Sequence, residues 1–267
     1  MKKAVFMLLL LAVPAVLAAE EPSGGRMRPK IGLVLSGGGA KGFAHIGVLK
    51  VLEEEHIPVD LITGTSMGSV VGSLYSMGYS AKELEHLALT LNWNDLIADI
   101  VPRRNILMRD RNEYDRYQAS IDIREWSLLI PSGIIRGQAL TDELTALTIP
   151  YHDTSDYSLF PIPFKCVATD IVTGKPVVLD RGFIPQSVRA SMSIPSFFTP
   201  VDLGGQLLVD GGIAENFPVS RAREMGAQII IGVDVGQPLY KEDELDSFDR
   251  IMEQSISFLG DISTQKE

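Results

Sequence analysis

The chain has 267 residues, of which 45% are hydrophobic and 22% are charged, and its formal net charge is −10. This length supports one domain with a full hydrophobic core. The acidic balance argues against a nucleic-acid partner and against a general attraction to anionic lipids, so any contact with a membrane surface would be local and apolar. Cys166 is the only cysteine, which excludes a disulfide bond within the chain.

The amino-terminal stretch has the pattern of a secretory signal peptide. Lys2 and Lys3 precede an apolar run from Ala4 to Ala19 that only Pro14 interrupts. The run is shorter than the about 20 residues of an ordinary membrane span, and the alanines at its end provide a cleavage site. We predict a signal peptide at residues 1–19, with a membrane anchor as the alternative, and export to the periplasm, the outer membrane or the medium.

The folded domain is predicted to follow a polar, flexible leader at residues 20–30 and to extend over residues 31–267. Apolar stretches at 31–36 and 59–63 predict strands, and the segments that follow them, 43–55 and 70–75, predict helices. This order of strand, helix, strand and helix is typical of a parallel sheet covered by helices.

Later elements follow the same kind of pattern. Ser80 and Glu83 form a capping box at the start of a helix that reaches Leu91. Residues 92–154 are less regular, and we interpret them as an insertion around the mouth of a site. Strands are predicted at 164–168, 177–179, 207–209 and 229–235, and helices at 138–148, 186–190, 219–225 and 244–259.

A possible nucleophile lies in the turn Gly64-Thr65-Ser66-Met67-Gly68, between the second predicted strand and its helix. A serine on such a sharp turn exposes its hydroxyl at the edge of the sheet, and glycines two residues away on each side avoid collisions across the turn. The helix that begins there favours negative charge, as an acyl-transfer intermediate requires. The pattern alone is weak evidence, because it also arises by chance.

A second glycine turn, Gly37-Gly38-Gly39-Ala40-Lys41-Gly42, follows the first predicted strand. Its amides, at the start of a helix, could stabilise a developing oxyanion at Gly37, Gly38 and Gly39. The turn also matches a dinucleotide-binding fingerprint, but the acidic residue available for ribose, Asp60, is at the start of the second strand rather than at its end. A P-loop is excluded, because no serine or threonine follows Lys41.

The general base must come from elsewhere in the chain. None of the four histidines, His45, His56, His86 and His152, follows a late strand as a hydrolase triad would require, although a triad with His86 or His152 stays open. Asp210 is the better candidate, because it ends a strand and precedes Gly211 and Gly212. The end of a strand would again place it at the carboxyl edge of the sheet, within reach of Ser66.

Together, the two glycine turns and Asp210-Gly211-Gly212 resemble the motifs of the patatin-like phospholipase family, and the run from Ala190 to Pro195 resembles a further feature of that family. The resemblance covers about residues 31–235. It implies an α/β fold, a three-layer sandwich with a mostly parallel central sheet, in a bacterial, exported member. It also implies a catalytic dyad of Ser66 and Asp210, an oxyanion hole at residues 37–39, and no metal or other cofactor. Lys41 stands where many relatives have arginine.

The resemblance implies a serine lipid acyl hydrolase of the phospholipase A, lysophospholipase or acylglycerol esterase type, with a phospholipid or acylglycerol as substrate. The alternatives are a catalytically silent lipid-binding or secretion-associated module and a nucleotide-binding protein. Residues 92–154 combine apolar side chains such as Trp93 and Leu96 with Arg103, Arg104, Arg109 and Arg111. They form either the acyl-chain entrance or lid, or a packed insertion with solvated arginines.

Overall fold

The computed structural model describes residues 28–100, 108, 122–124, 127–129, 133–236 and 239–264. The predicted signal peptide at 1–19 and most of the predicted leader at 20–30 lie outside the described residues, as do Arg103, Arg104, Arg109 and Arg111. Among the described helices, none combines the length and the apolar character that a membrane span requires.

The domain is built on a mixed sheet of seven strands. Four neighbouring strands run parallel, in the order β11 (Ile229–Val233), β1 (Ile31–Leu35), β2 (Leu61–Thr65) and β6 (Phe164–Asp170). The sheet continues from β6 with antiparallel strands, β10 (Gln206–Asp210) and then β9 (Val201–Leu203), and β7 (Pro176–Leu179) also pairs with β6. The predicted α/β class is therefore confirmed.

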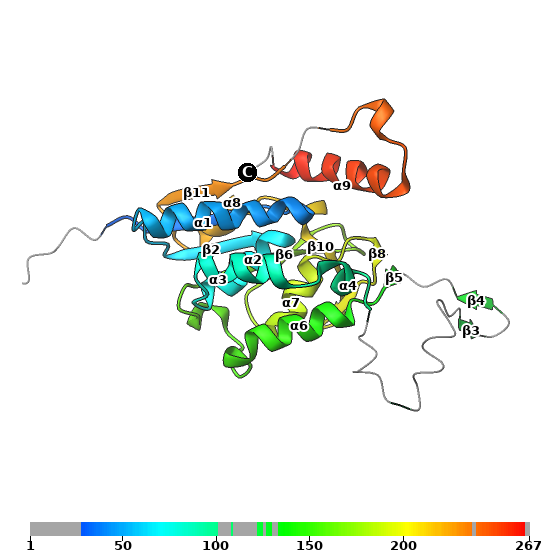
Figure 1. Ribbon diagram of the computed structural model, residues 1–267, viewed down its shortest axis with the longest axis horizontal. Helices are drawn as coiled ribbons and strands as arrows, with labels where there is room; N and C mark the ends of the chain where they lie inside the picture. The colour runs from blue at the N-terminus through cyan, green and yellow to red at the C-terminus, as the bar shows by residue number, and fades with distance from the viewer. Residues whose placement is uncertain are drawn as a thin grey trace, which may run out of the picture.

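Helices cover both faces of this sheet (Figure 1). The larger core cluster lies on one face, where Leu33, Ile62 and Phe164 of the strands are fully buried. The helices of this face are α1 (Ala44–Glu54), α2 (Met67–Ser76), α3 (Ala81–Thr90), α6 (Gln138–Thr148) and α7 (Ile184–Ser191). On the other face, α8 (Val219–Glu224) packs Val219 and Ala222 against Val34 and Leu61. This arrangement gives the three layers that the sequence predicts.

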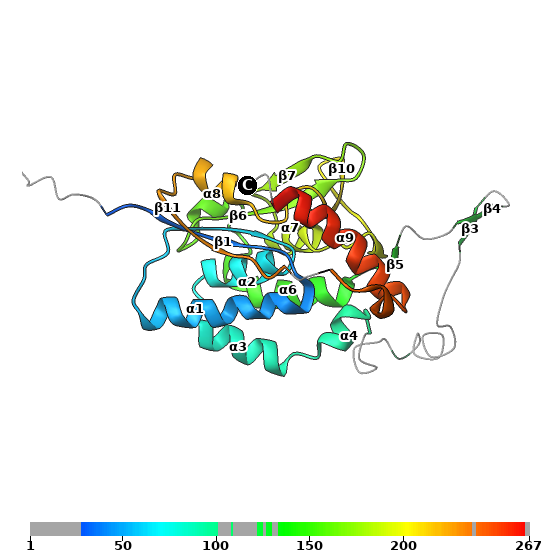
Figure 2. The ribbon, with the colours of Figure 1, turned by 90° about the horizontal axis from the view of Figure 1, so that it is seen from above.

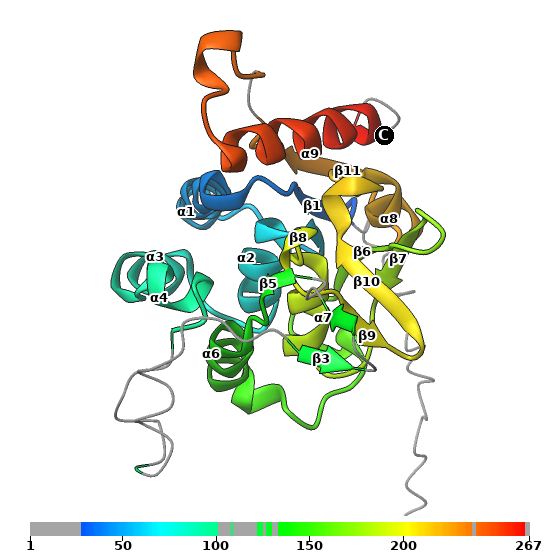
Figure 3. The same cartoon turned by 90° about the vertical axis from the view of Figure 1, so that its right-hand side faces the viewer.

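Several further elements lie at the carboxyl ends of the parallel strands (Figure 2). The helices α4 (Trp93–Ile97) and α9 (Phe248–Thr264) lie at this end. So does the short parallel pair of β5 (Gly133–Ile135) and β8 (Ser196–Phe198). A further antiparallel pair consists of β3 (Asp122–Arg124) and β4 (Ser127–Leu129). Figure 3 faces this edge of the sheet, with α9 on one side and α3 and α4 on another.

Short 3₁₀ helices connect several of these elements. They are η1 (Gly39–Phe43), η3 (Ile149–Tyr151), η4 (Tyr157–Leu159), η5 (Gly211–Ile213) and η6 (Glu242–Glu244). Two of them, η1 and η5, belong to the motifs that the sequence analysis singles out.

Most of the predicted boundaries agree with the structure to within a few residues. The capping box at α3 is confirmed, since Ser80 Oγ accepts from Glu83 N–H at 3.3 Å and Ser80 N–H donates to Glu83 Oε2 at 2.8 Å. The last helix begins at Phe248 and reaches Thr264, later than the predicted span of 244–259. The sequence does not predict β3, β4, β5, β8 and β9, because strands of three residues are too short to show an alternating pattern.

The packing of α2 against β1 and β2 explains the glycines that flank Ser66. A Cβ atom on Gly68 would lie 2.3 Å from the carbonyl oxygen of Leu35, and one on Gly64 would lie 2.5 Å from the carbonyl oxygen of Gly68. Backbone atoms cannot move away as the end of a side chain can, so the turn closes only with glycine at both positions. Gly47 in α1 differs, because it is exposed and a Cβ atom there would meet nothing within 4 Å.

These two helical glycines give substitutions of opposite effect. Gly68→Ala should lower the free energy of unfolding by about 2 kcal/mol or more, because α2 must move away from β1. Gly47→Ala should raise it by about 0.5–1 kcal/mol, because alanine favours the helix and adds no collision. Urea unfolding of both variants tests the packing. A Gly68→Ala protein as stable as the wild type would contradict the close approach of α2 to β1.

Candidate active site

Ser66 lies at the junction of β2 and α2, in the sharp turn that the sequence predicts. Its backbone has φ 53° and ψ −124°, a conformation that residues other than glycine rarely adopt. Several hydrogen bonds hold the residue in this conformation, among them one from Val70 N–H to the carbonyl oxygen of Ser66 at 3.3 Å. Ser66 N–H donates to Ser191 Oγ at 3.0 Å, and its carbonyl oxygen accepts from the N–H and the hydroxyl of Ser69 at 2.8 and 2.6 Å. The strain of the turn is thus offset by fixed polar contacts.

Asp210 reaches Ser66 by a different route from the one that the sequence analysis assumes. Its strand, β10, is antiparallel to β6, so it runs in the opposite direction to the parallel strands, although its last residue still lies at the carboxyl end of β2. β6 extends beyond β2, because Val167 pairs with Thr65 while residues 168–170 pair with β10. β10 runs back along this extension and ends at Asp210, opposite Ala168. Asp210 therefore arrives beside the Ser66 turn from the opposite direction.

The side chains of Ser66 and Asp210 are in direct contact. Ser66 Oγ donates to Asp210 Oδ2 at 2.7 Å, and Asp210 Oδ1 accepts from Gly212 N–H at 2.7 Å. Asp210 is only 3% exposed. Burial raises the pKa of Asp210 from 3.8 to about 6, because it disfavours the charged form, while the hydrogen bonds from Gly212 and Ser66 oppose that rise. This carboxylate has the geometry and the basicity to accept the proton of the serine hydroxyl.

The first glycine turn lies beside Ser66. A Cβ atom on Gly37 would be 3.1 Å from the Cβ atom of Ser66 and 2.5 Å from Asn216 Oδ1, so a larger residue would force the Asn216 side chain to move and would crowd Ser66. The N–H of Gly37 already donates to the carbonyl oxygen of Asn216 at 3.2 Å. Among the hydrogen bonds of the described residues, none uses the N–H of Gly38 or Gly39 as donor. These two amides are the ones that an anionic ligand could use.

The remaining motif residues cluster at the same place. Ala40, Lys41 and Gly42 belong to η1, and a Cβ atom on Gly42 would lie 2.3 Å from Met67 Cγ. The elbow is completed by Gly64 and Thr65 at the end of β2 and by Met67 and Gly68 in the first turn of α2, while Gly211 and Gly212 begin η5. The three motifs, distant in sequence, thus meet around one hydroxyl group.

The histidines do not take part in this contact. His45 is fully buried and bonds through Nε2 to the carbonyl oxygen of Ser36 at 2.9 Å. His152 is exposed and bonds to the carbonyl oxygen of Ile149. His56 lies beyond the end of α1, and His86 lies on α3. Within the described ranges, no hydrogen bond joins a histidine ring to Ser66 or Asp210.

Asp60 does not take the place that a dinucleotide site requires. It lies at the amino end of β2, whereas the glycine turn lies beyond the carboxyl end of β1. Its carboxylate accepts from both terminal nitrogens of Arg28 at 2.6 and 2.7 Å and from Ile31 N–H at 2.7 Å. The carboxylate thus joins the amino end of β2 to Arg28 and to the first residue of β1, and its position does not support ribose binding.

Several supporting residues were not identified as such from the sequence. Ser191 accepts from Ser66 N–H and donates to the carbonyl oxygen of Val167 at 2.6 Å, so it joins the turn to β6. Asn216 contacts the first glycine turn through its carbonyl oxygen. Both belong to loops or helix ends whose role depends on tertiary contacts. The position of Ser191 in the run from Ala190 to Pro195 is the one signal that points to it.

Comparison with known proteins places this chain in a family. Residues 33–223 match the family model described as patatin-like phospholipase. The lysophospholipase NTE1 of Kluyveromyces lactis is 32% identical over 232 residues, which are 82% of this chain and 14% of that protein. An uncharacterized NTE family protein of Mycobacterium bovis is 30% identical over 211 residues, which are 79% of this chain and 50% of that protein. The chain therefore spans half or less of the length of these relatives.

Among solved structures, VipD from Legionella pneumophila is similar with a TM-score of 0.46 and 17% identity, over 71% of this chain and 47% of that one. The type III effector ExoU is similar with a TM-score of 0.39 and 15% identity, over 89% of this chain and 52% of that one. The match of the family model to most of the folded domain and the identity to the two relatives show that this chain belongs to the patatin-like phospholipase family.

Proposed function

We propose that the protein is a serine hydrolase of acyl lipids in which Ser66 is the nucleophile and Asp210 the general base. The observation that carries this proposal is the 2.7 Å hydrogen bond from Ser66 Oγ to a buried carboxylate whose pKa is raised to about 6. A base of this strength is ionised at neutral pH and still able to accept a proton. The family and the NTE1 lysophospholipase support lipid esters as the substrate class.

The proposed reaction has two steps. Ser66 Oγ attacks the ester carbonyl carbon while its proton passes to Asp210, and the tetrahedral oxyanion accepts hydrogen bonds from the amides of Gly38 and Gly39. The intermediate collapses to an acyl-serine, and protonated Asp210 returns the proton to the leaving alcohol. Asp210 then activates a water molecule, which releases the fatty acid and restores Ser66. Gly37 supports the turn rather than the oxyanion, because its N–H is already donated to Asn216.

The substrate is proposed to be a phospholipid, a lysophospholipid or an acylglycerol. The family description and the name of the NTE1 relatives support a phospholipid or a lysophospholipid, and the acylglycerol rests on the family resemblance of the sequence motifs. Contact with a membrane surface belongs to the same proposal, and the net charge of −10 argues against a nucleic-acid partner. We also propose export through the predicted signal peptide at 1–19, which N-terminal sequencing of the mature protein tests.

An apolar crevice beside the site offers a place for the acyl chain. It lies between α1, α2, α3, α4 and α6, has a volume of about 30 Å³, and only Glu143 among its lining residues is charged. Its lining includes Val70, one turn from Ser66 in α2, and Phe43, which follows the glycine turn. The short helix α4 contributes Trp93 and Leu96 to the lining but buries none of its residues. We propose that α4 moves outward and lets an acyl chain widen this crevice.

The first prediction concerns the nucleophile. Ser66→Ala should abolish hydrolysis of p-nitrophenyl esters and of a phospholipid panel, because no other group in the site forms the acyl-enzyme. The variant should also lose covalent labelling by a fluorophosphonate, while circular dichroism shows an unchanged fold. Full ester hydrolysis by Ser66→Ala would contradict the mechanism. A wild-type protein that neither hydrolyses esters nor reacts with the fluorophosphonate would favour the catalytically silent alternative.

The second prediction concerns the base. Because the pKa of Asp210 is raised to about 6, kcat/KM should fall as the pH drops through about 6 rather than through 4. The pKa read from this acid limb of the pH profile should hardly change with temperature, since the ionisation of a carboxyl group has an enthalpy near zero. The pKa of an imidazole group would shift clearly. Asp210→Asn should be inactive at every pH. A limb that shifts with temperature as an imidazole does would contradict the assignment of the base.

The raised pKa of Asp210 also predicts how the stability of the protein depends on pH. A pKa raised from 3.8 to about 6 means that the folded protein binds the proton more tightly than the unfolded chain does. The wild type therefore loses stability as the pH rises from about 4 to 6, by about 3 kcal/mol for a shift of about two units. Asp210→Asn, which carries no charge, should be more stable than the wild type at pH 8 and not at pH 4. Urea unfolding of both proteins at pH 8 and at pH 4 measures this difference in the free energy of unfolding.

The crevice gives a prediction on chain length. Ala88→Phe fills the crevice from α3 and should lower kcat/KM for long-chain esters about tenfold or more relative to acetate or butyrate esters. Leu89→Phe is the matched control, because Leu89 lies on the same helix but is 80% exposed. The ratio of rates on long and short p-nitrophenyl esters measures the effect. An unchanged ratio in Ala88→Phe would show that the acyl chain binds elsewhere.

A further inference from the structure

The loop that follows the proposed base is connected to both other parts of the site. Its residues, 211–218, run from η5 to the start of α8. The carbonyl oxygen of Glu215 accepts from Thr65 Oγ1 at 2.9 Å, and that of Pro218 accepts from Thr63 Oγ1 at 3.0 Å. The carbonyl oxygen of Asn216 accepts from Gly37 N–H at 3.2 Å. The position of this loop therefore fixes the positions of β2, which carries Ser66, and of the glycine turn beside it.

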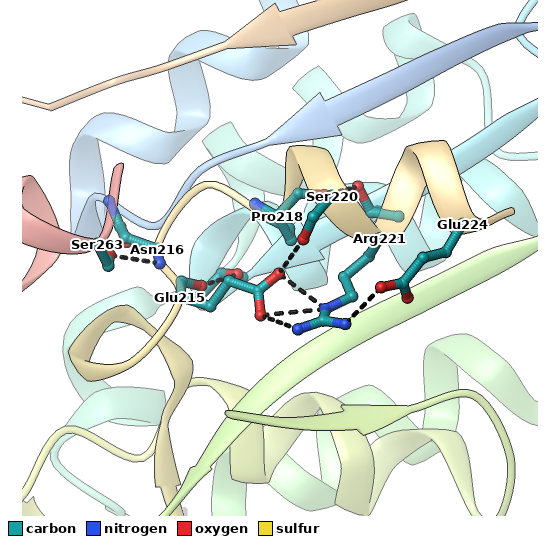
Figure 4. Close-up of polar contacts among 9 residues, drawn as sticks. Glu215, Asn216, Pro218, Ser220, Arg221, Glu224 and Ser263 are labelled. Carbon is teal, nitrogen blue, oxygen red and sulfur yellow. Dashed lines mark hydrogen bonds and ion pairs between the residues drawn. The ribbon is translucent and has the colours of Figure 1, made fainter. Parts of the chain in front are cut away.

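One buried side chain anchors this loop. Glu215 is 3% exposed, and its carboxylate accepts from Arg221 Nε at 2.9 and 3.1 Å and from an Arg221 terminal nitrogen at 2.9 Å. Ser220 Oγ donates to the same carboxylate at 3.3 Å. Figure 4 shows the carboxylate of Glu215 turned toward the guanidinium group of Arg221 on α8. A planar guanidinium group that holds a carboxylate through two of its nitrogens fixes both position and orientation.

The backbone of Glu215 is fixed as well. Its N–H donates to the carbonyl oxygen of Gly211 at 2.8 Å, one residue after the proposed base. The next residue, Asn216, donates its N–H to Ser263 Oγ of α9 at 3.0 Å. Glu215 thus has contacts on three sides, toward the Asp210 turn, toward the Ser66 strand and toward α8. The ion pair fixes the side chain of Glu215, and the backbone of the same residue contacts the motifs of the site.

We propose that Glu215 is a positioning residue for the catalytic site, and that its ion pair with Arg221 holds the 211–218 loop where the Ser66 turn, Asp210 and the first glycine turn come together. This inference rests on the proposed function of Ser66 and Asp210. Glu215 itself does not contact the substrate in this proposal, and it acts through the carbonyl oxygens of the loop.

The protein provides a matched comparison for a test. Arg221 also forms an ion pair with Glu224 at 2.8 Å, but Glu224 has a side chain that is 56% exposed and it lies on α8 itself. Exposed pairs of this kind add little to stability. Glu224→Gln and Glu215→Gln remove the same charge from the same arginine, and only the second change affects the loop.

In Glu215→Gln, the amide nitrogen of glutamine meets a donor of Arg221, so the side chain must turn and the loop must shift. A fluorophosphonate titration gives the concentration of active sites, to which kcat is referred. We expect kcat to fall roughly 10- to 100-fold, while KM for a short ester stays unchanged. The acid limb of kcat/KM should move upward, because the Ser66 hydrogen bond lowers the pKa of Asp210 and is weakened. Glu224→Gln should leave kcat and the acid limb unchanged.

A lower melting temperature of Glu215→Gln with unchanged kcat per titrated site and an unchanged acid limb would overturn the proposal, because the pair would then serve stability alone. Should Glu215→Gln give no titratable serine, Arg221→Lys takes its place, since lysine keeps the charge but lacks the planar fork, and the same two readouts decide. Ser66→Ala in parallel separates the two hypotheses. Activity retained in Ser66→Ala rejects the proposed function itself, whatever Glu215→Gln does.

Discussion

The hydrogen bond between Ser66 and Asp210 is the contact on which the rest of the site depends, and its character comes from burial. A carboxylate that is 3% exposed loses most of its hydration, and only the hydroxyl of Ser66 and the N–H of Gly212 contact its oxygens among the described residues. Two donors are fewer than a carboxylate can accept. The charge is therefore incompletely compensated, which raises the pKa of Asp210 to about 6. The same deficit that costs stability suits the carboxylate to the proposed role of a base near neutral pH.

The topology of the sheet makes this contact possible. Parallel strands alone would bring the Ser66 turn and the glycine turn together, since β1 and β2 are neighbours. The proposed base comes instead from β10, an antiparallel strand that uses the part of β6 beyond the end of β2. Asp210 therefore lies at the end of its own strand and also next to the end of β2. The loop after it, 211–218, then passes the carboxyl ends of β1 and β2, where its carbonyl oxygens accept hydrogen bonds from Thr65 of β2 and from Gly37 after β1.

The sequence predicts the parts of this structure that depend on local chemistry. Glycine turns after apolar strands, and the capping box at Ser80 and Glu83, follow from residue type and spacing, and they agree with the structure. The direction of β10 could not be predicted, because the pattern of a strand does not say which way it runs. The engagement of Gly37 by Asn216 could not be predicted either. It depends on a contact between residues far apart in the chain, for which a single sequence gives no signal.

A carboxylate whose raised pKa comes from burial constrains how the site can change. Any rearrangement that admits water to Asp210 adds hydration to the charged form, so the pKa of Asp210 would fall toward its ordinary value and the carboxylate would become a weaker base. The loop and α9 cover this region, and Asn216 joins them through Ser263. Movement for substrate entry is therefore better placed on the side of α4, which buries none of its residues, than on the side of the 211–218 loop. Rigid cover over the base and loose cover over the crevice would let one site be both dry enough for proton transfer and open enough for a lipid.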